Sequence, residues 1–233
     1  MQTKEERIDM VVIMMISGCL ISMAAFLYGV FKLFHKGKPL YFQLLVCAVG
    51  CYALGLVEFA VVDTCFPDGG SVIDFPASIA YVGCIAFLIT ANMFELKHVL
   101  KEKYNRKASV PALIAPIVYI SIIVWIIVLT ISSDPVYGIA MLLYTPGALT
   151  CYHNLKHLLL PPDDKGILKS IRGCDIWTLV LIFSANTYSL LYLISDSLAY
   201  LIVALFASIA SFLLVIYAVK GAKTWETQNY TCS

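Results

Sequence analysis

Few side chains in this chain can do chemistry inside its long apolar segments, and Glu58 is the most informative of them. It is the one acidic residue that we place well within such a segment, where an ionisable group is costly and usually faces a cavity or a partner. Counting back along a helix by three, seven and eleven residues gives Gly55, Cys51 and Cys47, small residues that let helices approach closely. The pattern predicts that Glu58 points into a helix bundle, either as a charge for a cationic ligand or as a structural hydrogen-bonding group.

Other polar and aromatic side chains recur at helical spacing in the later segments. Tyr81 and Asn92 share one predicted helix face, and Tyr200 and Ser211 share another with the same spacing. Interfacial rings and hydrogen bonds between helices are the structural alternatives for such residues. With Tyr144 beside a predicted kink and Asn186 near a midplane, the predicted ligand-binding residues are Glu58, Tyr81, Asn92, Tyr144, Asn186, Tyr200 and Ser211.

A histidine pair offers a weaker chemical signal. His153 and His157 are one helical turn apart, and with Cys151 or Glu95 they could ligate zinc, as in a membrane hydrolase. An interfacial pair at a basic helix end is the simpler interpretation, because we find no neighbouring acid suited to a general base. The sequence also lacks a Gly-rich phosphate loop, and its last apolar segment has no lysine that could bind retinal. We therefore predict no catalytic residue, metal or cofactor.

Seven apolar segments must position these side chains, and each is close to the about 20 residues needed to cross a bilayer. The composition agrees, because 61% of residues are hydrophobic and 13% are charged, against about 25% charged in soluble domains. The segments are Met10–Phe34, Leu40–Val62, Phe75–Phe94, Val110–Ile131, Val136–Leu160, Ile176–Ile194 and Leu198–Val219. The sequence thus predicts an all-α polytopic membrane protein with seven transmembrane helices in a single domain, 1–233.

Basic residues predict the orientation. Fourteen of the sixteen Lys and Arg residues fall on one side of the predicted helices, and only Lys4 and Arg7 fall on the other. Because basic residues in short loops stay in the cytoplasm, we expect the N-terminus outside and the C-terminus inside, in the plasma membrane. The basic loops need no nucleic acid to explain them, and the sequon at Asn229 would lie inside and stay bare.

Weak internal similarity suggests a repeat. Ala24, Tyr28 and Lys32 in the first segment match Ala148, Tyr152 and Lys156 in the fifth. This predicts a 3+1+3 parallel plan of two three-helix units, 10–94 and 136–219, joined by a linker helix, 110–131; chance recurrence of Ala and Tyr is the alternative. In architecture alone the plan resembles the SWEET and PQ-loop families, although no Pro-Gln pair occurs.

Three functions fit these features. The first, which we favour, is binding and transport of a small polar or cationic solute through a central cavity. The second is a receptor that signals through its basic cytoplasmic loops to a separate protein partner. The third is a membrane assembly partner that packs through its small residues. The repeat favours transport, and the expected partners are the lipid bilayer and a small-molecule ligand, with no nucleic acid.

Overall fold

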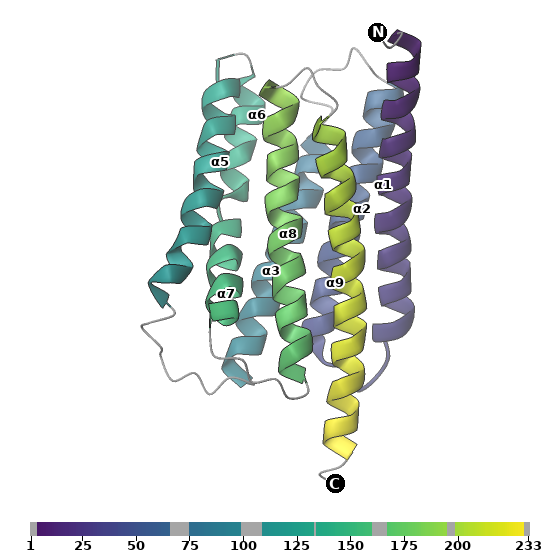
Figure 1. The fold of residues 1–233 in the computed structure, drawn as a ribbon, viewed down its shortest axis with the longest axis vertical. Helices are drawn as coiled ribbons and strands as arrows, with labels where there is room; N and C mark the ends of the chain where they lie inside the picture. Colours follow the sequence, from purple (N-terminus) through teal and green to yellow (C-terminus); the bar gives the residue numbers. More distant parts are fainter. Residues whose placement is uncertain are drawn as a thin grey trace.

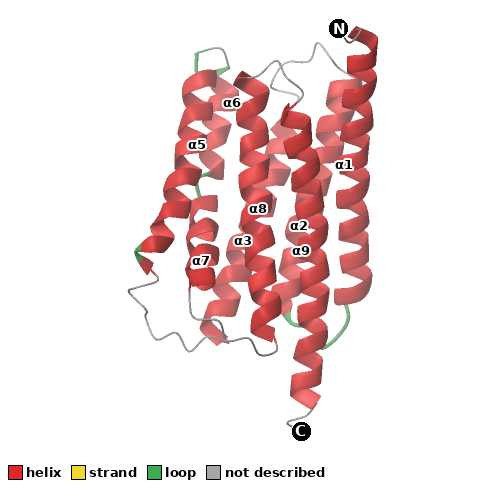
Figure 2. Cartoon of the chain, in the orientation of Figure 1, coloured by secondary structure: helices red, strands yellow, loops and turns green. Residues whose placement is uncertain are grey.

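In the computed structural model the residues that the structure describes, 4–65, 75–98, 109–132, 134–159, 167–194 and 199–230, form helices joined by short loops and turns, with no strand among them (Figures 1 and 2). The elements in chain order are α1 (Lys4–Leu33), α2 (Leu40–Cys65), α3 (Phe75–His98), η1 (Pro111–Leu113), α5 (Ile114–Thr130), α6 (Pro135–Ala140), η2 (Met141–Tyr144), α7 (Gly147–Leu159), α8 (Ile167–Ile194) and α9 (Ala199–Tyr230). This confirms the predicted all-α fold class.

Six of these helices are long and apolar enough to cross a membrane. Their apolar stretches are Val12–Leu33, Leu40–Val62, Pro76–Met93, Pro111–Thr130, Lys169–Ile194 and Ala199–Trp225. The outer face of α5 shows what surrounds them, because Ile117, Val124, Trp125 and Val128 are all exposed there. A surface of this kind requires lipid rather than water. The protein is therefore an integral membrane protein.

The helices stand side by side in one bundle, with the N-terminus at one end and the C-terminus at the other (Figure 1). We call these the N-terminal end and the C-terminal end of the bundle. On one side α1, α2, α8 and α9 pack in neighbouring pairs, and α3 lies against α2. On the other side α7 lies against α3, α5 and α8. The two groups therefore meet along α3 and α8.

Glycines allow the close approach of α1 and α2. A Cβ added at Gly50 would overlap the ring of Phe26, and one added at Gly29 would lie 2.6 Å from a methyl group of Val46. Each helix thus places a large side chain over a glycine of the other. The small-residue stripe predicted on α2 meets α3 in the same way, because a Cβ on Gly55 would lie 3.2 Å from the carbonyl oxygen of Ala77. Interlocking of this type stabilises helix pairs in lipid through close packing.

The fifth predicted segment is broken rather than continuous. Residues 135–159 form α6, η2 and α7 in succession, with turns at Thr145 and Pro146. Pro146 has no N–H, and the backbone around it uses tighter bonds of the i to i−3 type: Thr145 to Leu142 at 3.2 Å, and Ala148 to Thr145 at 3.0 Å. The kink predicted from Pro146 is therefore confirmed, although the prediction of a single continuous span is not.

The sixth predicted segment begins too late. We expected it to start at Ile176 because charged residues precede that position, yet α8 begins at Ile167 and its apolar stretch begins at Lys169. Arg172 and Asp175 thus belong to the helix rather than to a loop. Glu58 is consequently not the only acid within a spanning helix, and Asp175 is fully inside the bundle, with 1% of its surface exposed.

Candidate functional site

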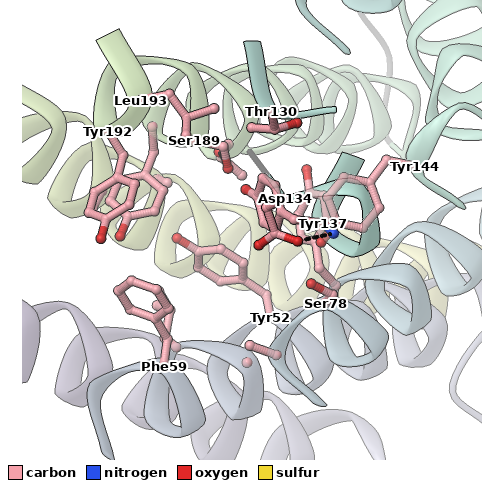
Figure 3. Close-up of a pocket in the computed structure, with 18 residues that line it drawn as sticks. Tyr52, Phe59, Ser78, Thr130, Asp134, Tyr137, Tyr144, Ser189, Tyr192 and Leu193 are labelled. Carbon is pink, nitrogen blue, oxygen red and sulfur yellow. Dashed lines mark hydrogen bonds between the residues drawn. The ribbon is translucent and has the colours of Figure 1, made fainter. Parts of the chain in front are cut away.

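A cavity of about 400 Å³ lies among the helices (Figure 3). It is toward the N-terminal end of the bundle, because its lining includes residues at the start of α3 and at the end of α8. Residues from α2, α3, α6, η2, α8 and α9, together with Thr130 and Asp134, form its wall. Its aromatic lining consists of Tyr52, Phe59, Tyr81, Tyr137, Tyr144, Tyr188 and Tyr192. The volume is in the range of sites that enclose small molecules.

One carboxylate faces this aromatic lining. Asp134 is half-buried and immediately precedes α6, where its side chain accepts a hydrogen bond from the backbone N–H of Tyr137 at 3.0 Å (Figure 3). That bond makes Asp134 the N-cap of α6, with Pro135 at the first helical position, a combination typical of helix starts. Among the described residues that line the cavity, Asp134 is the only acid, and none is Lys, Arg or His. The side chains of the lining therefore carry a net negative charge when Asp134 is ionised.

The rings are arranged at two sides of the cavity. Phe59 meets Tyr188 edge to face at 6.1 Å between centroids, and Tyr188 is stacked on Tyr192 at 6.3 Å. On the side that carries Asp134, Tyr81 meets Tyr144 at 4.8 Å in an edge contact. Aromatic pairs of this geometry favour each other by about 0.5–1.5 kcal/mol, so the rings hold one another in place.

A layer of hydrogen bonds lies directly beneath the cavity. Asn186 donates to the hydroxyl of Tyr81 at 3.0 Å and to the carbonyl of Ile182 at 2.8 Å. Tyr119, fully buried on α5, donates to the carbonyl of Tyr144 at 2.8 Å. In a continuous α-helix this carbonyl would accept from the N–H four residues later, that of Ala148. At the break the N–H of Ala148 donates to the carbonyl of Thr145 instead. Tyr119 thus satisfies a backbone group that the broken helix exposes.

The seven residues predicted from the sequence do not form one site. Tyr81 and Tyr144 line the cavity, and Asn186 lies one layer below, bonded to Tyr81. The other four do not line the cavity. Glu58 is half-buried on α2, and Asn92 is buried further along α3. Tyr200 packs its ring against Tyr188 and Tyr192, and Ser211 donates to Ser22 at 3.3 Å between α9 and α1.

Sequence reasoning missed the carboxylate and five of the seven aromatic residues of the cavity wall. The apolar segments place Asp134 in a loop, and helical spacing puts Tyr188 and Tyr192 on a different face of their helix from Ser189. All four residues line the cavity, because it is wide enough to be reached from two faces of α8. The i, i+4 spacing of Tyr188 and Tyr192 was the available signal, together with the Asp-Pro pair that begins α6.

The histidine pair has a partner that the sequence analysis did not anticipate. His157 is buried, and its Nδ1 lies 3.4 Å from Oδ2 of Asp175 on α8. The sequence analysis found no neighbouring acid suited to a general base, and it overlooked Asp175 because that residue comes from another helix. Within the described residues, no three His, Cys, Asp or Glu side chains come together as a metal site would require. The side chain of Glu95, one of the ligands considered for zinc, lies outside the described part.

No known protein family, curated protein or solved structure matches this chain.

Proposed function

We propose that this protein binds a small organic cation in the aromatic cavity and carries it across the membrane. The observation that carries the proposal is the pairing of seven aromatic rings with one carboxylate, Asp134, in a lining without basic side chains among the described residues. A cation above an aromatic face gains about 0.5–2 kcal/mol per ring, and a neutral solute gains no such term. The carboxylate adds a counter-charge on the Tyr137 side of the cavity. This combination favours an alkylammonium-like group over an anion or a sugar.

The broken fifth segment supports transport rather than simple binding. Tyr144 lines the cavity and belongs to η2, directly before the turns at Thr145 and Pro146. Non-helical backbone at membrane depth is tolerated where it lines a cavity or is buried in protein, and interrupted helices often form the sites of transporters. Movement of η2 relative to α7 would open the hydrogen-bonded layer formed by Tyr81, Asn186 and Tyr119. The solute would then gain a route toward the C-terminal end of the bundle.

A matched pair of probes tests the proposal. Choline and 3,3-dimethylbutan-1-ol have nearly the same shape, but only choline is charged. Purified protein in detergent should bind choline at least about tenfold more tightly than the alcohol, as measured by calorimetry. Vesicles that contain the protein should take up radiolabelled choline faster than protein-free vesicles. Equal affinity for the two probes would contradict cation recognition, and choline binding without uptake would contradict transport and favour a receptor.

We also propose that the cavity faces the outside of the cell, with the N-terminus outside and the C-terminus inside. The distribution of Lys and Arg supports this orientation. Cys65 is exposed at the last residue of α2, at the N-terminal end of the bundle (Figure 1). In intact cells that express a variant with Cys65 as its single cysteine, a membrane-impermeant maleimide should label the protein. A matched variant that keeps only Cys232 should react only after the cells are opened, and the reverse pattern would show the opposite orientation.

A further inference from the structure

A smaller space of about 30 Å³ adjoins the aromatic cavity, between α1, α2, α8 and α9. We call it the side chamber. Four residues line both spaces and form the boundary between them: Leu56, Phe59, Tyr188 and Ala204. Phe59 lies across the cavity from Asp134 (Figure 3), and its ring meets that of Tyr188 edge to face at 6.1 Å. The side chamber therefore begins behind this ring pair, at the side of the cavity away from the carboxylate.

The wall of the side chamber is mostly hydrocarbon and thioether. No Asp, Glu, Lys, Arg or His is among the described residues that line it. Its polar side-chain groups are the hydroxyls of Ser208 and Tyr188 and the thiol of Cys19, and the hydroxyl of Ser208 already donates to the carbonyl of Ala204 at 3.2 Å. A buried water needs about two to four polar partners, so such a wall suits an apolar group better than water. The large side chains that line the side chamber and not the cavity are Met14, Met15, Leu201 and Leu205.

Small residues keep the side chamber from closing. A Cβ added at Gly18 on α1 would lie 3.1 Å from Oγ of Ser208 on α9, so the two helices are already in close contact at this level. They cannot move together to fill the space, and side chains around an apolar void lose the dispersion contacts that a hydrocarbon group would supply. Met14 and Met15 on α1 are unbranched, so their side chains can adapt to a group that enters.

The cavity and the side chamber together thus form one space with two chemically different ends. Asp134 and the rings near it suit a positive charge, and the methionines and leucines beyond Phe59 suit a hydrocarbon chain. We propose that the cation carries such a chain, and that the chain passes the Phe59–Tyr188 ring pair and lies in the side chamber. This inference rests on the proposed function and names its substrate class, an amphiphilic cation in place of a compact one.

A series of alkyltrimethylammonium ions tests the chain site. Tetramethylammonium, n-propyltrimethylammonium and n-hexyltrimethylammonium share one charged group and differ only in the length of the chain. Each methylene group that becomes buried in an apolar space is expected to raise the affinity by about fourfold. Calorimetric titration of the purified protein should therefore show that the hexyl compound binds at least about tenfold more tightly than tetramethylammonium.

A tryptophan placed in the side chamber shows where the chain lies. Leu205 lines the side chamber but not the cavity, so Leu205→Trp adds bulk to the side chamber alone. In this variant the ratio of hexyl to tetramethylammonium affinity should fall by about fourfold or more. Ile202→Trp is the matched control on the same helix, because Ile202 is 64% exposed and lines neither space, and it should keep the ratio of the natural protein. Met14→Trp blocks the side chamber from α1 and should lower the ratio as well, so the test does not depend on the folding of one variant.

The outcomes separate this inference from the proposed function. Equal affinity across the series, with choline still bound, would overturn the chain site and leave cation recognition intact. A preference for the hexyl compound that is the same in Leu205→Trp, Met14→Trp and the natural protein would also overturn it, because the chain would then lie elsewhere or in the detergent. If neither choline nor any member of the series bound, the proposed function itself would fail, and the chain site with it.

Discussion

Replacement of Asp134 by asparagine is expected to weaken choline binding by about tenfold to a hundredfold. The substitution removes the one carboxylate among the described residues of the cavity wall, and with it the attraction for a cation. We expect an effect of this size rather than a larger one because Asp134 is only half-buried, so water screens part of its charge. Asparagine is as good an N-cap as aspartate, so α6 should keep its start and Tyr137 its position. Calorimetric titration of the variant with choline measures the change.

Glu58→Gln is the matched comparison, because it also neutralises one carboxylate in the same half of the bundle. The sequence-based hypothesis assigned the ligand charge to Glu58, whereas the cavity wall contains Asp134 and not Glu58. Affinity for 3,3-dimethylbutan-1-ol should stay the same in Asp134→Asn, since the alcohol has no charge. A loss of choline affinity in Glu58→Gln without a loss in Asp134→Asn would restore the first hypothesis and contradict the present one.

The fold could be predicted from the sequence because hydropathy and proline chemistry act locally. Long apolar runs predict spanning helices. Pro146 predicts a break in its helix whatever the packing around it, because proline lacks the N–H that a regular helix needs. The start of α8 could not be found this way, because Asp175 near its beginning is accommodated inside the bundle by its contact with His157 on α7. His157 meets Asp175 across eighteen positions of sequence, and nothing in the spacing indicates that contact.

The site was harder to predict, because a cavity depends on how helices pack and not on their periodicity. Tyr81 was predicted from its place on a polar helix face and Tyr144 from its place beside a kink, and both line the cavity. Asn186 was found as a buried amide, but it bonds to Tyr81 below the cavity. Ser211 has the same helical register as Tyr200, yet its neighbour is Ser22 of α1. The parallel repeat stays a prediction; its first counterpart, α1, is a continuous helix, whereas the fifth segment is broken.

Gly147→Ala is expected to destabilise the protein by about 1–3 kcal/mol, through overpacking at the break beneath the cavity. A Cβ at this position would overlap the hydroxyl of Tyr119 and lie 2.8 Å from the ring carbon that bears it. Tyr119 is fully buried, so its ring has little room to move away. Gly147 does not have a positive φ, so alanine suits the backbone and the cost is steric. Gly83→Ala is a matched control, because there the added Cβ meets only the side chain of Cys51, whose sulfur lies at 3.2 Å.

A double-mutant cycle with Tyr119→Phe identifies the contact responsible. Tyr119→Phe alone should cost about 1–3 kcal/mol, because the carbonyl of Tyr144 loses the hydroxyl that donates to it at 2.8 Å. In the double variant the hydroxyl that the added Cβ would overlap is gone, so the combined cost should be smaller than the sum of the two single costs by about 1 kcal/mol. Relief should be partial, because the ring carbon remains close to the added Cβ. Thermal unfolding in detergent measures each free-energy change, and strictly additive costs would show that Gly147 and Tyr119 do not act through this contact. Non-additivity would show that Tyr119 and Gly147 act through this contact, at the turn between the cavity-lining η2 and α7.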